Sequence, residues 1–136
     1  MDIRPLTDDY AVSPQIAAKD LPAIAAAGYV AILCNRPDAE VGPEARADAI
    51  ELAAREAGLA FSRNPVTHQG LNDEMVARQR AVVEEAGGPV LAYCASGTRS
   101  TIVWALGQAG RRPAAEIVER AARAGYDIAG LAPRLG

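Results

Sequence analysis

The residues best suited to chemistry lie in one stretch, 94–100, with the sequence Cys-Ala-Ser-Gly-Thr-Arg-Ser. An apolar run precedes this stretch and a helical pattern follows it, which predicts a strand, a tight loop and the start of a helix. The backbone N–H groups of such a loop and the dipole of the following helix bind anions and favour the thiolate form of a cysteine. We therefore expect Cys94 to be a nucleophile beside an anion-binding loop.

Four residues separate Cys94 from Arg99, whose guanidinium can bind two oxygens of an anion at once. This arrangement suits attack on a phosphate ester, which gives a cysteinyl-phosphate, or attack on an outer sulfur atom, which gives a persulfide. A cysteine that only packs in the core is the structural alternative. The predicted anion ligands are the residues around Cys94 and an arginine at a neighbouring strand end: Ala95, Ser96, Gly97, Thr98, Ser100 and Arg36. Arg36 could equally form a loop ion pair with Asp38 or Glu40.

A phosphatase also needs a general acid that protonates the leaving oxygen. Asp73 and His68 are the candidates in the segment upstream of the cysteine loop. Asp73 could equally cap a helix, and His68 could simply be solvated. Cys34 ends an earlier apolar run with no glycine-rich loop after it, and it is predicted either to pack or to act as a resolving thiol. The sequence contains no pattern of metal ligands, and we expect no metal and no cofactor.

The elements that must position these residues alternate between strands and helices. Apolar runs predict strands at 29–33, 59–63 and 90–93, and one or two short strands, or a hairpin, within 2–12. Periodic apolar residues and turn signals predict helices between them, at about 21–28, 43–58, 72–87, 98–108 and 114–124.

This alternation predicts an α/β fold, with a central, mostly parallel sheet flanked by helices on both faces. Residues 1–136 have the length of one domain. Sites in such sheets form at the carboxyl ends of the strands. The loops at 34–38, 64–70 and 94–99 should therefore converge.

Composition argues against several classes of partner. The net charge is −3, which does not favour nucleic acid or an anionic membrane surface. No apolar run approaches the roughly 20 residues that cross a bilayer. With two cysteines and no signal-peptide pattern, we expect a cytoplasmic protein with reduced thiols. The sequence leaves a homo-oligomer open.

Almost the whole chain resembles a bacterial family of phosphatase-like domains, the beta-lactamase hydrolase-like family, also called DUF442. The resemblance rests on residues 13–15, 35–40, 64–66 and 94–100. It implies a fold similar to that of dual-specificity and tyrosine phosphatases. Members of the family occur alone or fused to a persulfide dioxygenase domain, which implies a link to sulfide handling and a persulfide dioxygenase as a partner.

Two features depart from the tyrosine phosphatase pattern. Tyr93 stands where that pattern has a histidine, and the spacing between Cys94 and Arg99 is one residue shorter. The shorter loop resembles that of rhodanese sulfurtransferases and leaves less room for a tetrahedral phosphate. The sequence thus favours a sulfurtransferase that forms a Cys94 persulfide from a small-molecule sulfur donor. A phosphatase acting on phosphotyrosine or other phosphate esters is the first alternative, and a non-catalytic anion- or partner-binding module is the second.

Overall fold

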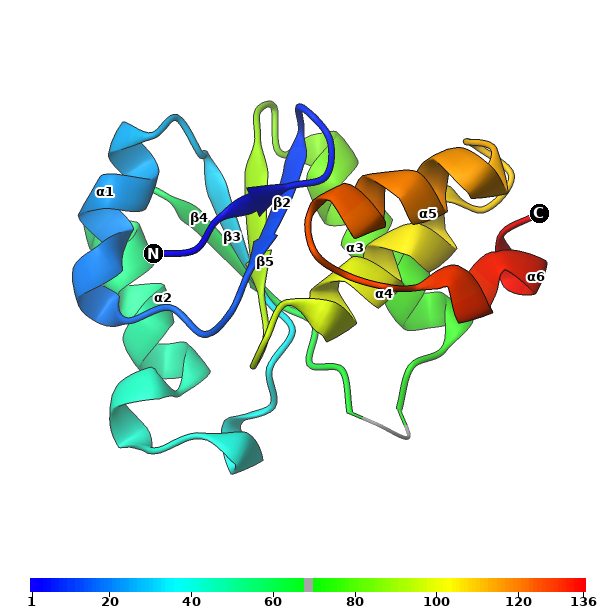
Figure 1. Cartoon of the computed structure of the whole chain (residues 1–136). Helices are drawn as coiled ribbons and strands as arrows, with labels where there is room; N and C mark the ends of the chain where they lie inside the picture. Colours follow the sequence, from blue (N-terminus) through cyan, green and yellow to red (C-terminus); the bar gives the residue numbers. More distant parts are fainter. Residues whose placement is uncertain (68–69) are drawn as a thin grey trace.

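A sheet of five strands lies between two groups of helices in the computed structural model, which describes residues 1–67 and 70–136 (Figure 1). The strand order is β1-β2-β5-β3-β4. β1 and β2 form an antiparallel hairpin, and the other neighbouring strands are parallel. The predicted α/β fold with a mostly parallel sheet is confirmed. The strands are β1 (Arg4–Pro5), β2 (Tyr10–Ser13), β3 (Ala31–Cys34), β4 (Ala60–Arg63) and β5 (Val90–Tyr93).

The helices are divided between the two faces of the sheet (Figure 1). One face carries α1 (Leu21–Ala26) and α2 (Ala47–Glu56). The other carries α3 (Asp73–Glu85), α4 (Thr98–Gln108), α5 (Ala114–Arg123) and α6 (Ala132–Leu135). Short 3-10 turns occur at Ala18–Asp20 (η1), Asp38–Glu40 (η2), Pro43–Ala45 (η3) and Ala129–Leu131 (η4). Within the described residues, no helix has the length and apolar character needed to cross a membrane.

The helix predicted at 43–58 is divided into two elements. Pro43–Ala45 forms the separate turn η3, and Arg46 adopts an extended conformation (φ −63°, ψ 154°) before α2 begins. The Asp38 carboxylate accepts a hydrogen bond from the Ala47 N–H at 2.8 Å. This contact satisfies one of the N–H groups at the start of α2 that have no partner within the helix.

The core has two layers because both faces of the central strands are covered. Ile32 and Leu91 pack with α1 and α2, whereas Leu33 and Ala92 pack with α4 and α5. Burial on both sides explains why these strands are continuous apolar runs and not alternating patterns.

The three parallel strands at the centre of the site end in register. Cys34, the last residue of β3, lies opposite Arg63 of β4 and Tyr93 of β5. The segments that follow these strands lie at the same end of the sheet (Figure 1). Backbone hydrogen bonds join them: the Asn35 N–H donates to the Tyr93 carbonyl, and the Val66 N–H donates to the Asn35 carbonyl, both at 2.8 Å. The predicted convergence of the loops is confirmed.

Candidate active site

Cys94 lies directly after β5 and is fully buried. Its Sγ accepts a hydrogen bond from the Gly97 N–H at 3.1 Å. Gly97 has φ +96° and precedes α4, so the loop reaches the helix through a left-handed residue. A Cβ at this position would also overlap the Tyr126 hydroxyl. The loop therefore requires glycine here for two reasons, its backbone angle and its close contact with Tyr126.

Hydrogen bonds to the surrounding structure and within the loop hold the cysteine loop in place. The Gln15 N–H donates to the Ala95 carbonyl at 3.3 Å, and the Tyr126 hydroxyl donates to the Ser96 carbonyl at 2.9 Å. The Ser96 Oγ accepts from the Thr98 N–H at 3.3 Å. These bonds fix the orientation of the peptide groups before an anion arrives, which is the kind of preorganisation that stabilises developing charge.

Arg99 lies in the first turn of α4, and its guanidinium is held on one side. Nη1 donates to Glu40 Oε2 at 2.7 Å and to the Val66 carbonyl at 2.8 Å, and Nη2 donates to Glu40 Oε1 at 2.7 Å. A guanidinium has five N–H groups. Glu40 and Val66 do not use the N–H of Nε or the second N–H of Nη2. These two N–H groups form one edge of the guanidinium, and such an edge can bind two oxygens of an anion. The Glu40 carboxylate raises the pKa of Arg99, and the Cys94 side chain adds to this effect.

Glu40, on η2, connects the two arginines of the site. It accepts from Arg99, and its Oε1 also accepts from Arg36 Nε at 3.3 Å. Arg36 further donates to Gln15 Oε1 at 3.1 Å. The hydrogen bond from Arg99 is the main reason that the pKa of Glu40 lies below its usual range. Sequence reasoning considered Glu40 only as an ion-pair partner of Arg36 and missed its contact with Arg99.

Ser100 does not serve as an anion ligand, contrary to the sequence prediction. Its side chain is fully buried, and its Oγ donates to Asn35 Oδ1 at 2.9 Å. The Ser100 carbonyl accepts from the Tyr10 hydroxyl at 2.7 Å. Ser100 therefore anchors the start of α4 to the sheet.

Ser100 belongs to a buried network of polar side chains centred on Gln79 of α3. Gln79 Nε2 donates to Tyr10 Oη at 3.0 Å and to Asn35 Oδ1 at 2.9 Å. Gln79 Oε1 accepts from the side chains of Asn35 and Asn64, both at 2.8 Å. Asn35 and Asn64 follow β3 and β4 directly. We call this set, with Ser100, the amide network; it ties the cysteine loop to two neighbouring strand ends and to α3.

Among the described residues, no contact joins Asp73, one of the two predicted general acids, to the cysteine loop. Asp73 is exposed in the first turn of α3, where Asn72 is the N-cap and accepts from the Met75 N–H at 2.9 Å. His68 lies outside the described residues. Of the two residues that the sequence offers as the helix cap, Asn72 and Asp73, Asn72 takes that position and Asp73 lies in the first turn.

Cys34 is buried, and its Sγ donates to the Arg36 carbonyl at 3.4 Å. Burial raises the pKa of the Cys34 thiol. Its neighbour in register is Tyr93 and not Cys94. This environment fits the packing interpretation better than that of a resolving thiol. Over the described residues, no group of three or more histidine, cysteine or acidic side chains could hold a metal ion.

The fold and this loop define a phosphatase-like α/β domain with a cysteine at the start of a helix. Residues 2–111 match the model of one family, described as "Beta-lactamase hydrolase-like protein, phosphatase-like domain". The chain belongs to this family. A beta-lactamase hydrolase-like protein of Xylella fastidiosa Temecula1 is 33% identical over 131 residues, and one from Agrobacterium fabrum C58 is 31% identical over 117 residues. The matches cover 94% and 85% of this chain but only 30% and 27% of the relatives, so the chain spans less than a third of their length.

Solved structures with this fold include phosphatases. A candidate phosphatase from Neisseria meningitidis Z2491 has a TM-score of 0.87 and 34% identity, over 99% of this chain and 96% of that one. Tk-PTP in its active form has a TM-score of 0.73 at 18% identity, over 98% of this chain and 92% of that one. TpbA of P. aeruginosa, solved in complex with pTyr, has a TM-score of 0.66 at 14% identity, over 93% and 75%. The last two share the tyrosine phosphatase fold with this chain.

These comparisons favour the phosphatase alternative over the sulfurtransferase interpretation. The family and its relatives are phosphatase-like, consistent with an enzyme that uses a cysteine nucleophile. In the structure, the position of the Arg99 guanidinium depends on Glu40 and Val66 as well as on the length of the loop.

Proposed function

We propose that this domain is a cysteine-based phosphatase that hydrolyses phosphate esters through a cysteinyl-phosphate intermediate. The observation that carries the proposal is the pairing of the buried Cys94 sulfur, which accepts from the Gly97 N–H, with an arginine whose Nε edge is not used by Glu40 or Val66 and can bind two oxygens. Membership of a phosphatase-like family and 34% identity to a candidate phosphatase support it.

The reaction would proceed in two steps. The Cys94 thiolate attacks phosphorus, the bond from phosphorus to the ester oxygen breaks, and the leaving oxygen takes a proton. Water then attacks the cysteinyl-phosphate, releasing inorganic phosphate and restoring the thiolate. The loop N–H groups and the Arg99 edge would bind the phosphoryl oxygens in both steps, where fixed donors stabilise the charge of the transition state.

The proton donor of the first step would come from the segment that runs from the end of β4 to the first turn of α3, where Asp73 and His68 remain the proposed general acids. Asp38 and Glu40 are less suited to this role. Asp38 accepts from the Ala47 N–H, and the pKa of Glu40 is held down by Arg99, so Glu40 stays ionised at neutral pH.

The substrate class we propose is an aryl phosphate such as phosphotyrosine, because TpbA, which shares the fold, was solved with pTyr. The test is hydrolysis of p-nitrophenyl phosphate, with intact mass spectrometry to detect a phosphoryl group on the protein. Cys94→Ser should abolish both signals, and Cys34→Ser is the matched control that should retain both. Activity that survives in Cys94→Ser would exclude the mechanism.

A comparison of leaving groups identifies the general acid. A good leaving group needs little protonation, so loss of the acid should slow phenyl phosphate far more than p-nitrophenyl phosphate. Asp73→Asn and His68→Asn are the two variants to compare. An equal effect on both substrates would exclude the substituted residue as the acid.

Sulfur transfer is the second candidate, and the four-residue spacing between Cys94 and Arg99 favours it. Incubation with thiosulfate or glutathione persulfide would then add the mass of one sulfur atom, and Cys94→Ser would prevent it. A persulfide dioxygenase would be the partner to test with that product. If neither phosphoryl nor sulfur adduct forms on Cys94, the non-catalytic binding module becomes the favoured function.

A further inference from the structure

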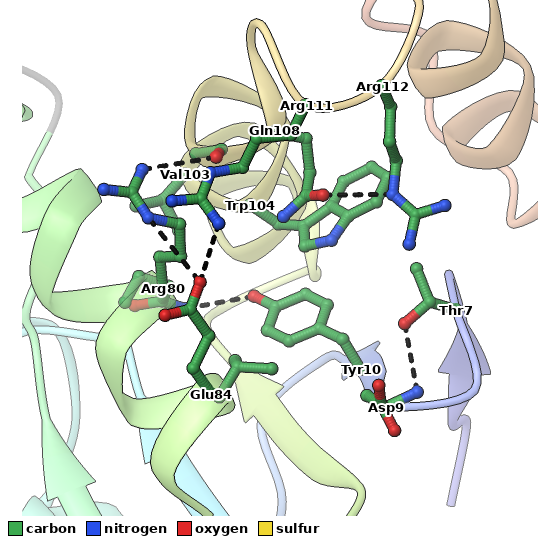
Figure 2. Close-up of a pocket in the computed structure, with 13 residues that line it drawn as sticks. Thr7, Asp9, Tyr10, Arg80, Glu84, Val103, Trp104, Gln108, Arg111 and Arg112 are labelled. Atoms are coloured by element: carbon green, nitrogen blue, oxygen red, sulfur yellow. Dashed lines mark hydrogen bonds and ion pairs between the residues drawn. The ribbon is translucent and has the colours of Figure 1, made fainter.

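A cavity away from the cysteine loop lies between α3, α4 and the turn that joins β1 to β2 (Figure 2). Its volume is about 190 Å³, and its lining contains none of the residues 94–100. Tyr10 and Trp104 form an aromatic part of the lining, with ring centroids 6.2 Å apart and planes inclined by 13°. Val83, which is partly exposed, adds aliphatic surface, and the fully buried Val103 lies beneath the lining. One part of the cavity is therefore suited to an apolar group.

The polar part of the lining offers hydrogen-bond donors. The Trp104 side chain is only 5% exposed, yet its indole N–H makes no hydrogen bond to any residue that the structure describes. Because Trp104 lines the cavity, this N–H is available to donate to a bound acceptor. Arg112 lies on the same lining (Figure 2), and its Nε donates to Gln108 Oε1 at 3.0 Å. That bond orients the guanidinium, and its nearest carboxylate, Glu116, is 3.7 Å from Nη1.

The charges around the cavity favour an anion. Three arginines and two acids line it: Arg80, Arg111, Arg112, Asp9 and Glu84. Glu84 is already paired with Arg111 at 2.8 Å and lies 3.9 Å from Arg80 (Figure 2). Asp9 is exposed. Arg112, whose ion pair with Glu116 is long at 3.7 Å, is a cation placed to pair with a ligand.

We propose that this cavity binds a small organic carboxylate with a branched aliphatic or aromatic body. The carboxylate would accept from the Trp104 indole N–H and from Arg112, and the body would pack mainly on Val83 and on the accessible part of Trp104. A planar carboxylate matches a guanidinium edge, and the apolar lining distinguishes such a ligand from a bare inorganic anion. The volume is that of about six water molecules, which limits the ligand to a compact body.

Trp104 is the only tryptophan of the chain, so its fluorescence reports on this cavity directly. The probes are 4-methylpentanoate, its neutral amide and inorganic phosphate, each titrated into the intact protein. We expect a saturable fluorescence change with 4-methylpentanoate and binding of the amide at least about tenfold weaker, because a hydrogen bond to a charged group is lost. Failure to saturate below roughly 10 mM 4-methylpentanoate would overturn the proposal. Binding of phosphate as tight as that of the carboxylate would overturn the ligand class.

Substitutions locate the ligand within the protein. Arg112→Gln should weaken binding of 4-methylpentanoate about tenfold, while Arg123→Gln removes the same charge from the exposed face of α5 and should leave it unchanged. Trp104→Phe, followed by calorimetry, should also weaken binding, provided that circular dichroism shows an intact fold. Cys94→Ser should bind the probe like the original chain, which separates this site from the proposed phosphatase function. Unchanged affinity in Arg112→Gln, or loss of binding in Cys94→Ser, would refute the assignment.

Discussion

The contact between Glu40 and Arg99 allows a sharp test of how the candidate active site works. Glu40 binds the Nη1 and Nη2 side of the guanidinium through two bonds of 2.7 Å and leaves the Nε edge open. Glu40 therefore orients Arg99 and does not occupy its anion-binding edge. In Glu40→Gln, the amide can accept only one of the two hydrogen bonds, and its NH₂ group opposes the other N–H.

The size of the effect follows from the burial of the pair. The Arg99 side chain is 13% exposed and that of Glu40 is 31% exposed, so the pair is partly screened. Its contribution lies between that of an exposed ion pair and that of a charge-assisted hydrogen bond, about 1–2 kcal/mol. We expect KM for p-nitrophenyl phosphate to rise about tenfold, and kcat to change less because Glu40 contacts Arg99 and not the Cys94 sulfur.

The assay measures kcat and KM at neutral pH, together with the Kd for inorganic phosphate by calorimetry. Glu44→Gln removes the same charge from the neighbouring turn η3 and is the matched control. A fall in KM and Kd in Glu40→Gln would refute the reasoning, because it would mean that the carboxylate competes with the substrate for Arg99.

Three further predictions concern the loop, the network and acid pH. Gly97→Ala should destabilise the fold by more than the roughly 1–2 kcal/mol of a left-handed alanine, because its Cβ overlaps the Tyr126 hydroxyl, and it should lose activity. Gly28→Ala, where φ is +103° and nothing lies within 4 Å, should cost only the backbone strain; equal losses in urea denaturation would contradict the steric argument. Gln79→Leu should lower the free energy of unfolding by about 3 kcal/mol or more, because several buried polar partners lose their bonds, and a loss below about 1 kcal/mol would show that the network contributes little. The stabilisation from Glu40, whose pKa is lowered in the fold, should be complete above its unfolded value near 4.5 and lost as the pH falls through the folded value, so the stability difference between Glu40→Gln and the original chain should vanish in strong acid.

Much of the fold could be predicted because local patterns encode it. The apolar runs at β3 and β5 are unbroken since both faces are covered, and the cysteine loop combines glycine and hydroxyl residues that only a strand-to-helix junction of this kind requires. The convergence of the loops followed from the parallel arrangement of the strands. The break between η3 and α2 was missed because alanines continue the helical pattern across it.

The contacts that complete the site join residues that are far apart in the sequence, so local sequence patterns do not predict them. Glu40 and Arg99 are 59 residues apart, and nothing near either residue indicates the pairing. Gln79 did give a signal, since it falls in the inward-facing stripe of α3 among apolar residues, where a polar side chain needs buried partners. The spacing of Cys94 and Arg99 ranked sulfur transfer first, whereas membership of a phosphatase-like family favours the phosphatase alternative.

The amide network has a consequence for how inhibitors of this site should be sought. Ser100, Asn35, Asn64 and Gln79 are each at most 2% exposed and hold the base of the cysteine loop to the sheet and to α3. A loop mounted in this way cannot adjust to an ill-fitting molecule without breaking several buried hydrogen bonds at once. Compounds that match its resting shape should therefore bind with little entropic loss, and rigid scaffolds should outperform flexible ones of the same composition.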